Sequence, residues 1–461
     1  MSVTLILPGD IASEIAERTP LPYETGGVLL VRRISTPTGI RLLGRTICWV
    51  DEAAYRERTQ FGMAITPEGY LPALALAEAD QSIALWFHTH PAGPLGPHPS
   101  DADAEVDKVL SETFRIRTGS DCYGTLIASG GDTPFAFTGR FYDPDGHILP
   151  IERLWVVGDR WRLIQAHGTE RGVPTGMFDR NVRAFGSAIQ SILGDLVIAI
   201  TGAGGTGSAV AEQLVRLGVR HLILADADHL SASNVTRVYG STPADVGRPK
   251  VEVLRDHLLA IAPDLEIRTI IGMATLQDVA AALTGADLIF GCTDDNAGRL
   301  VLSRLSTWLL TPVIDIGVLL TSGIEGLLDG IHARVTTLAP GHACLLCRNR
   351  IDVARAAAEL QTPEERKRLV DEGYAPALGQ AEPAVVAFTT AVAAAAVNEL
   401  LDRLIGYGPP ERPSETLLRL HEREISTNHA HPREGHYCHP GAGKWGAGGE
   451  QPFLGQLWPT L

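Results

Sequence analysis

The sequence predicts a two-part α/β protein: an α+β domain followed by a doubly wound domain built on a parallel sheet. Its 461 residues are more than one hydrophobic core usually organises. The first part mixes short β-type runs with a few helical patterns, whereas strand and helix patterns alternate from Gly194 onward. Apolar residues make up 45% and charged residues 20% of the chain, as in ordinary globular proteins.

The first domain is expected to be α+β. Its expected strands are apolar runs at 3–8, 26–33, 41–50, 82–91 and 123–129. A helix is expected at 10–17, and a second after Ser100, which is a suitable N-cap. The following stretch is rich in Gly, Pro and charge around one apolar run. We therefore expect a domain at 1–150 and a linker at 151–176.

The second domain is expected at 177–427. Its expected strands are at 196–201, 221–228, 265–270, 287–294 and 311–320, and its expected helices at 206–217, 246–261, 276–283, 296–309 and 384–405. Strands separated by helices indicate a parallel, doubly wound sheet. Residues 428–461 are rich in His, Gly and Pro and are expected to form a C-terminal tail.

Charge and hydropathy narrow the classes of partner. Lys and Arg total 39 against 54 for Asp and Glu, a formal net charge of −15, so no nucleic-acid or membrane partner is expected. The N-terminus lacks the pattern of a secretory signal, and the apolar stretch 383–398 is shorter than a membrane span. Six cysteines do not make a disulfide scaffold. These features favour a cytoplasmic protein.

A candidate metal site follows one of the first strands. His88 and His90 share one face of a strand, because side chains alternate along it. Asp103, in the first turn of the helix after Ser100, could be a third ligand. Two histidines and a carboxylate leave a fourth zinc position for water, as a catalytic site requires. Glu24 is the candidate general base. For either histidine alone, the alternative is an ordinary core or surface residue.

This combination resembles the JAB/MPN domain, the JAMM metalloprotease family that cleaves after ubiquitin-like C-termini. The resemblance covers most of the first domain. It implies a catalytic zinc held by His88, His90 and Asp103, with Glu24 transferring the proton and Ser100 helping to stabilise the oxyanion. The loop between His90 and Ser100 is longer than in the commonest form of the family. A non-catalytic module that binds the partner is the alternative for this domain.

A glycine-rich segment follows the strand at 196–201 and opens a helix. Its glycines are Gly202, Gly204, Gly205 and Gly207. They let backbone N–H groups and the helix N-terminus approach a phosphate chain. Asp226, at the end of the next strand, has the position of a ribose-binding acid. These features alone would first suggest an NAD-dependent dehydrogenase.

Further charged and polar residues point away from a dehydrogenase. They are Arg180 before the first strand, and Asp228, Asn234, Arg237, Lys250 and Asp294 after the glycine-rich segment. Several cations and an additional acid suit the cleavage of a triphosphate, because the cations neutralise phosphates and the acid holds magnesium. Arg183 and Arg299 are expected to be solvated surface groups.

The set resembles the ThiF-type adenylyltransferases, relatives of the ubiquitin-activating enzymes, over about residues 177–425. The resemblance implies that Asp226 and Asp228 lie in the nucleotide site, with Asp226 binding the ribose of ATP, and that Asp294 coordinates magnesium. It implies phosphate contacts from three further side chains, Asn234, Arg237 and Lys250.

The same resemblance implies the partner and the assembly. The product would be an acyl-adenylate on the C-terminal glycine of a ubiquitin-like protein. Arg180 matches an arginine that members of the family often donate across a dimer interface, so a homodimer is expected.

A second zinc site is expected near the C-terminus. Cys344 and Cys347 form a CxxC pair, and Cys438 lies between His436 and His439. Three thiolates and one imidazole make a closed, structural zinc site, in which the fourth ligand is either of the two histidines. The alternative is a group of reduced, buried thiols.

The segment where ubiquitin-activating enzymes carry a thioester-forming cysteine contains none between 348 and 384. Cys48, Cys122 and Cys292 are expected to be structural. The reaction therefore either stops at the adenylate or passes the acyl group directly to a separate protein, such as a conjugating enzyme. A catalytic role for a cysteine of the CxxC pair is the third option.

The sequence thus predicts a bifunctional enzyme. A zinc isopeptidase-like domain and an ATP-dependent adenylating domain would act on the C-terminus of one ubiquitin-like protein, a fusion that resembles those of bacterial ubiquitin-like conjugation operons. The alternative keeps the adenylation but turns the product into the thiocarboxylate of a sulfur-carrier protein.

Overall fold

The computed structural model describes residues 2–91, 96–130, 135–167, 176–322, 327–372 and 383–458. The chain forms two compact units. Unit 1 comprises Met1–Glu170, Trp308–Leu310 and Trp445–Phe453, and unit 2 comprises Arg171–Thr307, Thr311–Lys444 and Leu454–Leu461. Among the helices of the described ranges, none has both the length and the apolar character that a membrane crossing requires.

Unit 1 is built on one large sheet. Its strands are β1 (Val3–Pro8), β2 (Thr25–Thr36), β3 (Gly39–Trp49), β6 (Ile83–His90), β7 (Tyr123–Gly130), β8 (Phe135–Tyr142), β9 (Ile148–Val157) and β10 (Arg162–Gln165). They are ordered β1-β3-β2-β6-β7-β8-β9-β10, and β1 also pairs with β9, which closes the sheet on itself. A small hairpin of β4 (Tyr55–Arg58) and β5 (Met63–Ile65) lies outside this sheet.

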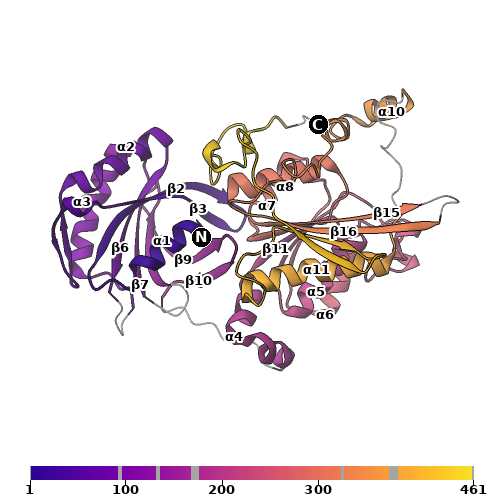
Figure 1. The fold of residues 1–461 in the computed structure, drawn as a ribbon, viewed down its shortest axis with the longest axis horizontal. Coiled ribbons are helices and arrows are strands. Elements are labelled where there is room, and N and C mark those ends of the chain that lie inside the picture. Colours follow the sequence, from indigo (N-terminus) through magenta and orange to yellow (C-terminus); the bar gives the residue numbers. More distant parts are fainter. Residues whose placement is uncertain are drawn as a thin grey trace. The chain divides into compact units, whose positions relative to one another are not determined.

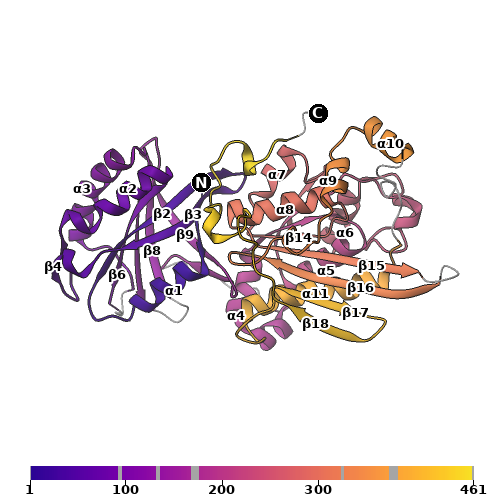
Figure 2. The ribbon, with the colours of Figure 1, turned by 45° about the horizontal axis from the view of Figure 1, so that its top comes forward.

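In the described part of unit 1, three α-helices cover the sheet. They are α1 (Gly9–Arg18), α2 (Leu71–Asp80) and α3 (Asp101–Thr118). Ile11 and Ile15 of α1 join one hydrophobic cluster, whereas Leu74 of α2 and Phe114 of α3 join another. Alternation along the strands sends side chains into both clusters. Figures 1 and 2 show α2 and α3 together at one end of this unit, away from α1.

The stretch that we expected to be a linker differs from the prediction. Residues 151–165 lie largely in β9 and β10, and Leu154, Trp155 and Val156 are buried. The apolar run at the centre of that stretch is long enough to pair with β1, so it completes the first sheet. The rest of the predicted linker includes 168–175, which lies outside the described residues.

Unit 2 contains a second eight-stranded sheet. Its strands are β11 (Val197–Thr201), β12 (His221–Ala225), β13 (Glu266–Ile270), β14 (Leu288–Gly291), β15 (Val313–Ser322), β16 (Leu328–Leu338), β17 (Glu415–Arg419) and β18 (Glu424–Asn428). The order is β13-β12-β11-β14-β15-β16-β17-β18. The first five strands pair in parallel, as expected, and β15 to β18 form an antiparallel extension that the sequence analysis did not anticipate.

The helices of unit 2 lie on both faces of its sheet. They are α4 (Asp179–Asp195), α5 (Gly205–Leu217), α6 (Lys250–Ile261), α7 (Gln277–Leu283), α8 (Asn296–Leu309), α9 (Val353–Glu359), α10 (Pro363–Asp371) and α11 (Val386–Ile405). Figures 1 and 2 show α7 and α8 on one side of the sheet and α5 and α11 on the other. This arrangement confirms a Rossmann-like, doubly wound domain and creates a crevice where the strand order reverses beside β11.

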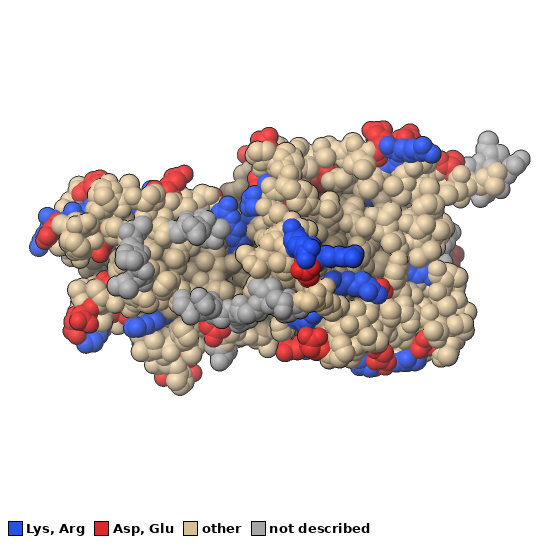
Figure 3. All heavy atoms as spheres, turned by 90° about the horizontal axis from the view of Figure 1, so that it is seen from below, with Lys and Arg blue, Asp and Glu red and all other residues tan. Residues whose placement is uncertain are grey.

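The protein surface agrees with the moderate charge content of the sequence. On the face shown in Figure 3, basic and acidic side chains lie in small mixed groups. Uncharged residues separate these groups from one another. Neighbouring charges of opposite sign limit the electrostatic field that such a surface projects.

Candidate functional site

Four of the residues expected at the metal site of unit 1 lie together. β6 places His88 and His90 on one face, with their Nε2 atoms 3.1 Å apart. The Asp103 carboxylate lies 3.2 Å from His88 Nε2 and 3.6 Å from His90 Nε2. Glu24 Oε1 lies 3.8 Å from His90 Nε2. Ligands 2.0–2.1 Å from a tetrahedral zinc are about 3.3 Å apart, so this donor set fits one ion.

Ser100 acts on the same carboxylate. Its hydroxyl accepts from the Asp103 backbone N–H at 3.1 Å and donates to Asp103 Oδ2 at 2.8 Å. This capping box starts α3 where the sequence predicted it. Ser100 therefore orients a candidate ligand, and its role at an oxyanion stays a prediction.

The two carboxylates of this site are in different electrostatic environments. Burial raises the pKa of Glu24. Burial acts in the same direction on Asp103, but hydrogen bonds from His88 and His90 hold the pKa of Asp103 well below its usual range. Asp103 is thus suited to stay ionised as a ligand, and Glu24 to accept and release a proton.

Arg58 positions the backbone around Glu24. Its guanidinium lies 4.0 Å from the ring centre of Tyr23 and 4.5 Å from that of Tyr55. Its Nε donates to the Glu24 carbonyl at 2.8 Å, and its NH2 donates to Thr25 Oγ1 at 2.6 Å. Sequence reasoning missed this residue, because no local motif marks it.

A cavity of about 870 Å³ occupies the crevice of unit 2, a volume suited to a nucleotide-sized ligand. It lies at the carboxyl ends of the parallel strands, where doubly wound sheets bind ligands. Eight of the predicted residues line it: Gly202, Gly204, Gly205, Asp226, Asp228, Arg237, Lys250 and Asp294.

Two of the glycines, Gly202 and Gly207, allow backbone segments to approach more closely than a side chain would permit. Gly202 has φ of +92°, and a Cβ there would lie 2.6 Å from the carbonyl oxygen of Cys292. A Cβ on Gly207 would lie 1.8 Å from the Gly202 carbonyl oxygen. Gly204 caps α5 without a side chain, so the first turn of α5 is open to an anion.

The acids and the lysine form a connected group. Asp226 Oδ2 accepts from the Ala203 N–H at 2.6 Å, and its Oδ1 accepts from the Asp228 N–H at 2.8 Å. Burial raises the pKa of Asp226. Lys250 Nζ donates to Asp228 Oδ2 at 2.7 Å, and both residues line the cavity.

Three predicted residues are absent from the described lining, and one of them, Gly207, lies in the glycine-rich segment beside it. Asn234 is absent from the described lining of the cavity; its Oδ1 accepts from the Ser231 N–H at 3.0 Å and stabilises a 3-10 turn. Arg180 is exposed on α4 and is also absent from that lining within its own chain.

Arg299 does not lie where the sequence analysis expected it. It was expected to be a solvated surface group, but its side chain is 16% exposed and lines the cavity. Its Nε lies 3.6 Å from the fully buried Asp315, which also pairs with Arg334. The sequence held one signal for this contact. Asp315 lies inside an otherwise apolar strand, where a buried acid requires a charged partner. Arg183 is exposed, as expected, and pairs with Asp179 at 2.9 Å.

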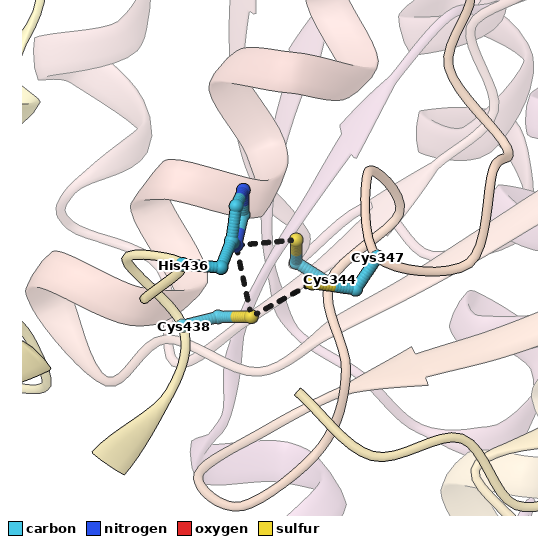
Figure 4. A group of neighbouring side chains, drawn as sticks. All are labelled: Cys344, Cys347, His436 and Cys438. Carbon is cyan, nitrogen blue, oxygen red and sulfur yellow. Dashed lines mark hydrogen bonds between the residues drawn. The ribbon is translucent and has the colours of Figure 1, made fainter. Parts of the chain in front are cut away.

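The three cysteines and His436 cluster as predicted (Figure 4). Cys344 Sγ lies 3.6 Å from His436 Nδ1, and Cys347 Sγ lies 3.6 Å from Cys438 Sγ. The distance between His436 Nδ1 and Cys438 Sγ is 3.3 Å. His439 instead accepts from the Gly441 N–H, so the structure favours His436 as the fourth donor.

The thiols of Cys344 and Cys438 influence each other's ionisation. A hydrogen bond with Cys438 lowers the pKa of Cys344 to about 5, and the same contact raises the pKa of Cys438. Donor spacings of this size match three sulfurs and one nitrogen around a tetrahedral zinc.

Curated relatives match a little over a third of the chain. Molybdopterin-synthase adenylyltransferase of Escherichia coli is 32% identical over 170 residues, covering 37% of this chain and 65% of that protein. HesA of Nostoc is 31% identical over 164 residues, covering 35% and 61%. Ubiquitin-like modifier-activating enzyme 5 of rice is 31% identical over 184 residues, covering 36% and 40%. The chain thus spans about two thirds or less of these relatives.

Solved structures are more distant in sequence. Escherichia coli MccB, crystallised with MccA-N7isoASN, is 17% identical, with a TM-score of 0.45 over 57% of this chain and 74% of that chain.

The model of the ThiF family matches residues 178–439, which are more than half of the chain and include all of the described cavity lining. The chain therefore belongs to the ThiF family.

Proposed function

We propose that unit 2 uses ATP and magnesium to adenylate the C-terminal glycine of a ubiquitin-like or sulfur-carrier protein. The observation that carries this proposal is one cavity in which the glycine-rich loop, Asp226, Lys250 and Asp294 converge. Membership of the ThiF family supports this proposal. The names of relatives support it as well, among them the sulfur carrier protein ThiS adenylyltransferase of Escherichia coli.

Each residue has a distinct task in this reaction. The N–H groups at the start of α5 bind the phosphates, and Asp226 accepts hydrogen bonds from the ribose hydroxyls. Lys250 and Arg237 neutralise charge on the phosphates, and Asp294 holds magnesium. A carboxylate oxygen of the terminal glycine attacks the α-phosphorus, the bond to pyrophosphate breaks, and acyl-adenylate and pyrophosphate are the products.

The active assembly is proposed to be a homodimer. Arg180 is exposed on α4 and outside the described cavity lining of its own chain, so it would have to reach the cavity of a second copy. Light scattering of the full chain tests this: a fully active monomer would exclude a shared site.

Unit 1 is proposed to be a JAMM-type zinc hydrolase that acts on the same C-terminus. His88, His90 and Asp103 would hold the ion, which when bound supplies a water acidified toward about neutral pH. Glu24 takes up a proton and delivers it to the leaving amine, a task that its raised pKa supports. The complete donor set argues against a module that only binds the partner.

The cysteine cluster is proposed to be a structural zinc site. Cys344, Cys347, Cys438 and His436 would occupy all four positions, which leaves none for a substrate. With these cysteines used and none between 348 and 384, the acyl group would pass from the adenylate to a separate protein or to a sulfur donor.

ATP–pyrophosphate exchange tests the adenylation. The substrate is a purified ubiquitin-like or sulfur-carrier protein that ends in glycine, and the comparison is Asp294→Ala. Exchange that needs the terminal glycine and disappears in the variant is expected. Protein adducts of the partner would then indicate conjugation, whereas release of a thiocarboxylate would indicate sulfur transfer.

The hydrolase is tested with a C-terminally extended form of the same partner. We expect cleavage after the terminal glycine and its loss in Glu24→Ala. Cleavage at an unchanged rate in that variant would contradict the assignment of Glu24 and of the hydrolase.

A further inference from the structure

The short helix α9 contributes to the wall of the cavity in unit 2. It lies in the segment 348–384, which contains no cysteine and to which the proposed adenylation gives no task. Asp352 caps α9 by accepting from the Arg355 N–H at 3.0 Å, and both residues line the cavity. Glu359, at the other end of α9, is absent from the described lining. Any role of Glu359 in the reaction would therefore be exerted through other residues.

Glu359 binds the start of α8. Its Oε2 accepts from the Ala297 N–H at 2.9 Å, and its Oε1 accepts from Asn296 Nδ2 at 3.4 Å. In return, Asn296 Oδ1 accepts from the Asp352 N–H at 2.9 Å. The side chain of Glu359 is 8% exposed, and Asn296 is also buried. Both ends of α9 are thus fastened to the start of α8, and Figure 2 shows the two helices side by side.

The start of α8 adjoins the candidate magnesium ligand, Asp294. This residue is exposed and lines the cavity. The next residue, Asp295, accepts from the Gly298 N–H and from the Thr293 hydroxyl. Asp295 and Glu359 therefore satisfy N–H groups in the first turn of α8, where the helix dipole stabilises negative charge. The backbone on both sides of Asp294 is restrained as a result.

The position of Asp294 matters because magnesium requires near-ideal octahedral geometry. A ligand carboxylate that shifts binds such an ion more weakly, and loss of a group that orients a ligand typically costs about 10- to 100-fold in metal affinity. The cap from Asp295 is local in the sequence. By contrast, Glu359 lies 62 residues along the chain from Ala297, so only the tertiary fold brings it to this loop.

We propose that Glu359 is a positioning residue for the adenylation and that its contact with the start of α8 fixes Asp294 for magnesium. This inference rests on the proposed function, because it takes Asp294 as the magnesium ligand. Glu359 also accepts from Arg355 Nε at 3.0 Å, and Arg355 is a cation of the cavity lining. The test must therefore separate an effect on magnesium from an effect on this cation.

The test measures how much magnesium strengthens nucleotide binding to the full chain. A fluorescent, non-hydrolysable ATP analogue is titrated with and without magnesium, and the ratio of the two Kd values is called the magnesium effect. Glu359→Gln keeps the size of the side chain but replaces one accepting oxygen by a donating amide group. We expect this variant to lower the magnesium effect about tenfold, with little change in the Kd without magnesium. Equal weakening under both conditions would point to Arg355 and would overturn the proposal.

Two further variants distinguish contact from charge. Glu359→Asp keeps the negative charge but is one methylene group shorter, so it should lose the contact with the Ala297 N–H and much of the magnesium effect. A full magnesium effect in this variant would show that only the charge matters, which would overturn the proposal. Asp294→Ala should have no magnesium effect. If its magnesium effect were normal, Asp294 would not be the ligand and the inference would fail.

Glu372→Gln is the matched control. Glu372 pairs with Arg368 four residues before it, as Glu359 pairs with Arg355, but its side chain is 46% exposed and it is absent from the described lining. This variant should keep the full magnesium effect, and an equal loss in Glu372→Gln and Glu359→Gln would overturn the proposal. Circular dichroism checks that each variant is folded. If Glu359→Gln does not fold, Glu359→Asp decides the question; failure of both to fold would show that Glu359 serves the fold rather than the site.

Pyrophosphate exchange separates this inference from the proposed function, because the magnesium effect is a binding measurement. A magnesium effect that depends on Glu359, in a protein that shows no exchange with any partner, would keep the inference and remove the adenylation. Exchange by Glu359→Gln with the magnesium dependence of the wild type would support the adenylation and remove the inference.

Discussion

In unit 1, Arg58 of the small hairpin holds the backbone of Glu24, the candidate base. Its planar fork joins the Glu24 carbonyl to the Thr25 hydroxyl while two tyrosine rings flank it. Lysine keeps the charge but loses the fork and the stacking. We expect Arg58→Lys to lower kcat of the proposed hydrolysis about 10- to 100-fold, because small displacements of a catalytic group are costly.

The control for Arg58 is its exposed neighbour on the same strand, Arg56. Arg56→Lys should leave kcat unchanged. Both variants should keep the wild-type KM and zinc content, because neither residue is a candidate ligand. A loss of zinc in Arg58→Lys, or an unchanged kcat, would mean that Arg58 does not position Glu24.

The glycine-rich loop contains two glycines that differ in their surroundings. A Cβ on Gly207 would penetrate the Gly202 carbonyl at 1.8 Å, whereas one on Gly204 meets nothing within 4 Å. Gly207→Ala is expected to lower the free energy of unfolding by about 1–3 kcal/mol or more, since the backbone must shift. Gly204→Ala should fold with a nearly unchanged Tm and weaken ATP binding, because its methyl group faces the cavity.

Calorimetry and ATP titration check this pair. Similar stability of the two variants would show that the close approach at Gly207 is not needed for the fold. Unaltered ATP affinity in Gly204→Ala would place the phosphates away from the start of α5.

At the scale of elements, the sequence was informative wherever apolar periodicity reflected burial. The parallel strands β11 to β15 were predicted within a few residues of their observed ends. β16 was not predicted, because Arg334 and His332 interrupt its apolar pattern to line the cavity. β9 was assigned to a linker, since its neighbours in sequence are rich in Gly, Pro and charge.

The candidate sites also divide into residues that local sequence patterns reveal and residues that only the tertiary fold brings together. His88 and His90, and the CxxC pair, were identified because strand alternation and local spacing already place their donors together. Arg58 and Arg299 depend on partners such as Tyr23 and Asp315, which only the tertiary fold brings near. Local patterns therefore predicted the chemistry of the sites but not the residues that position it.

Glu212 joins α5 to α6 and gives these helices a pH-dependent contact. Its side chain is 15% exposed and accepts from His257 at 2.7 Å and Arg216 at 2.8 Å. Burial opposes ionisation, but these hydrogen bonds lower the pKa of Glu212 below its usual value of 4.5. The contact thus stabilises the folded state above about pH 4.5 and loses its effect as the pH falls through the lowered pKa.

We expect Glu212→Gln to lower the free energy of unfolding by about 1 kcal/mol at pH 7 and by progressively less below about pH 4.5. Urea denaturation across this range measures the difference. Glu105→Gln, at a side chain that is 75% exposed, is the control and should change little at any pH. If the difference in stability between the wild type and Glu212→Gln grew as the pH fell, the prediction would be contradicted.

On the scale of the whole molecule, each unit holds a cluster of side chains that could bind a metal ion. The cluster of unit 1 offers two imidazoles and carboxylates, which leaves room for water. That of unit 2 has three sulfurs and one imidazole, and two of its residues, Cys344 and Cys438, are buried. The same ion is thus expected to exchange readily in unit 1 and slowly in unit 2, where it would also secure the segment around Cys438.

Mass spectrometry of purified protein is expected to find about two zinc ions per chain. The double variant His88→Ala/His90→Ala should retain one ion and a Tm close to that of the wild type, because β6 and α3 keep their apolar contacts. Cys347→Ala should also retain one ion but melt several degrees lower, because a structural zinc contributes directly to folding. If the cysteine variant kept both ions, or lost one without any change in Tm, the cluster in unit 2 would not be a structural zinc site; loss of both ions in the histidine variant would show that the two clusters do not bind metal independently.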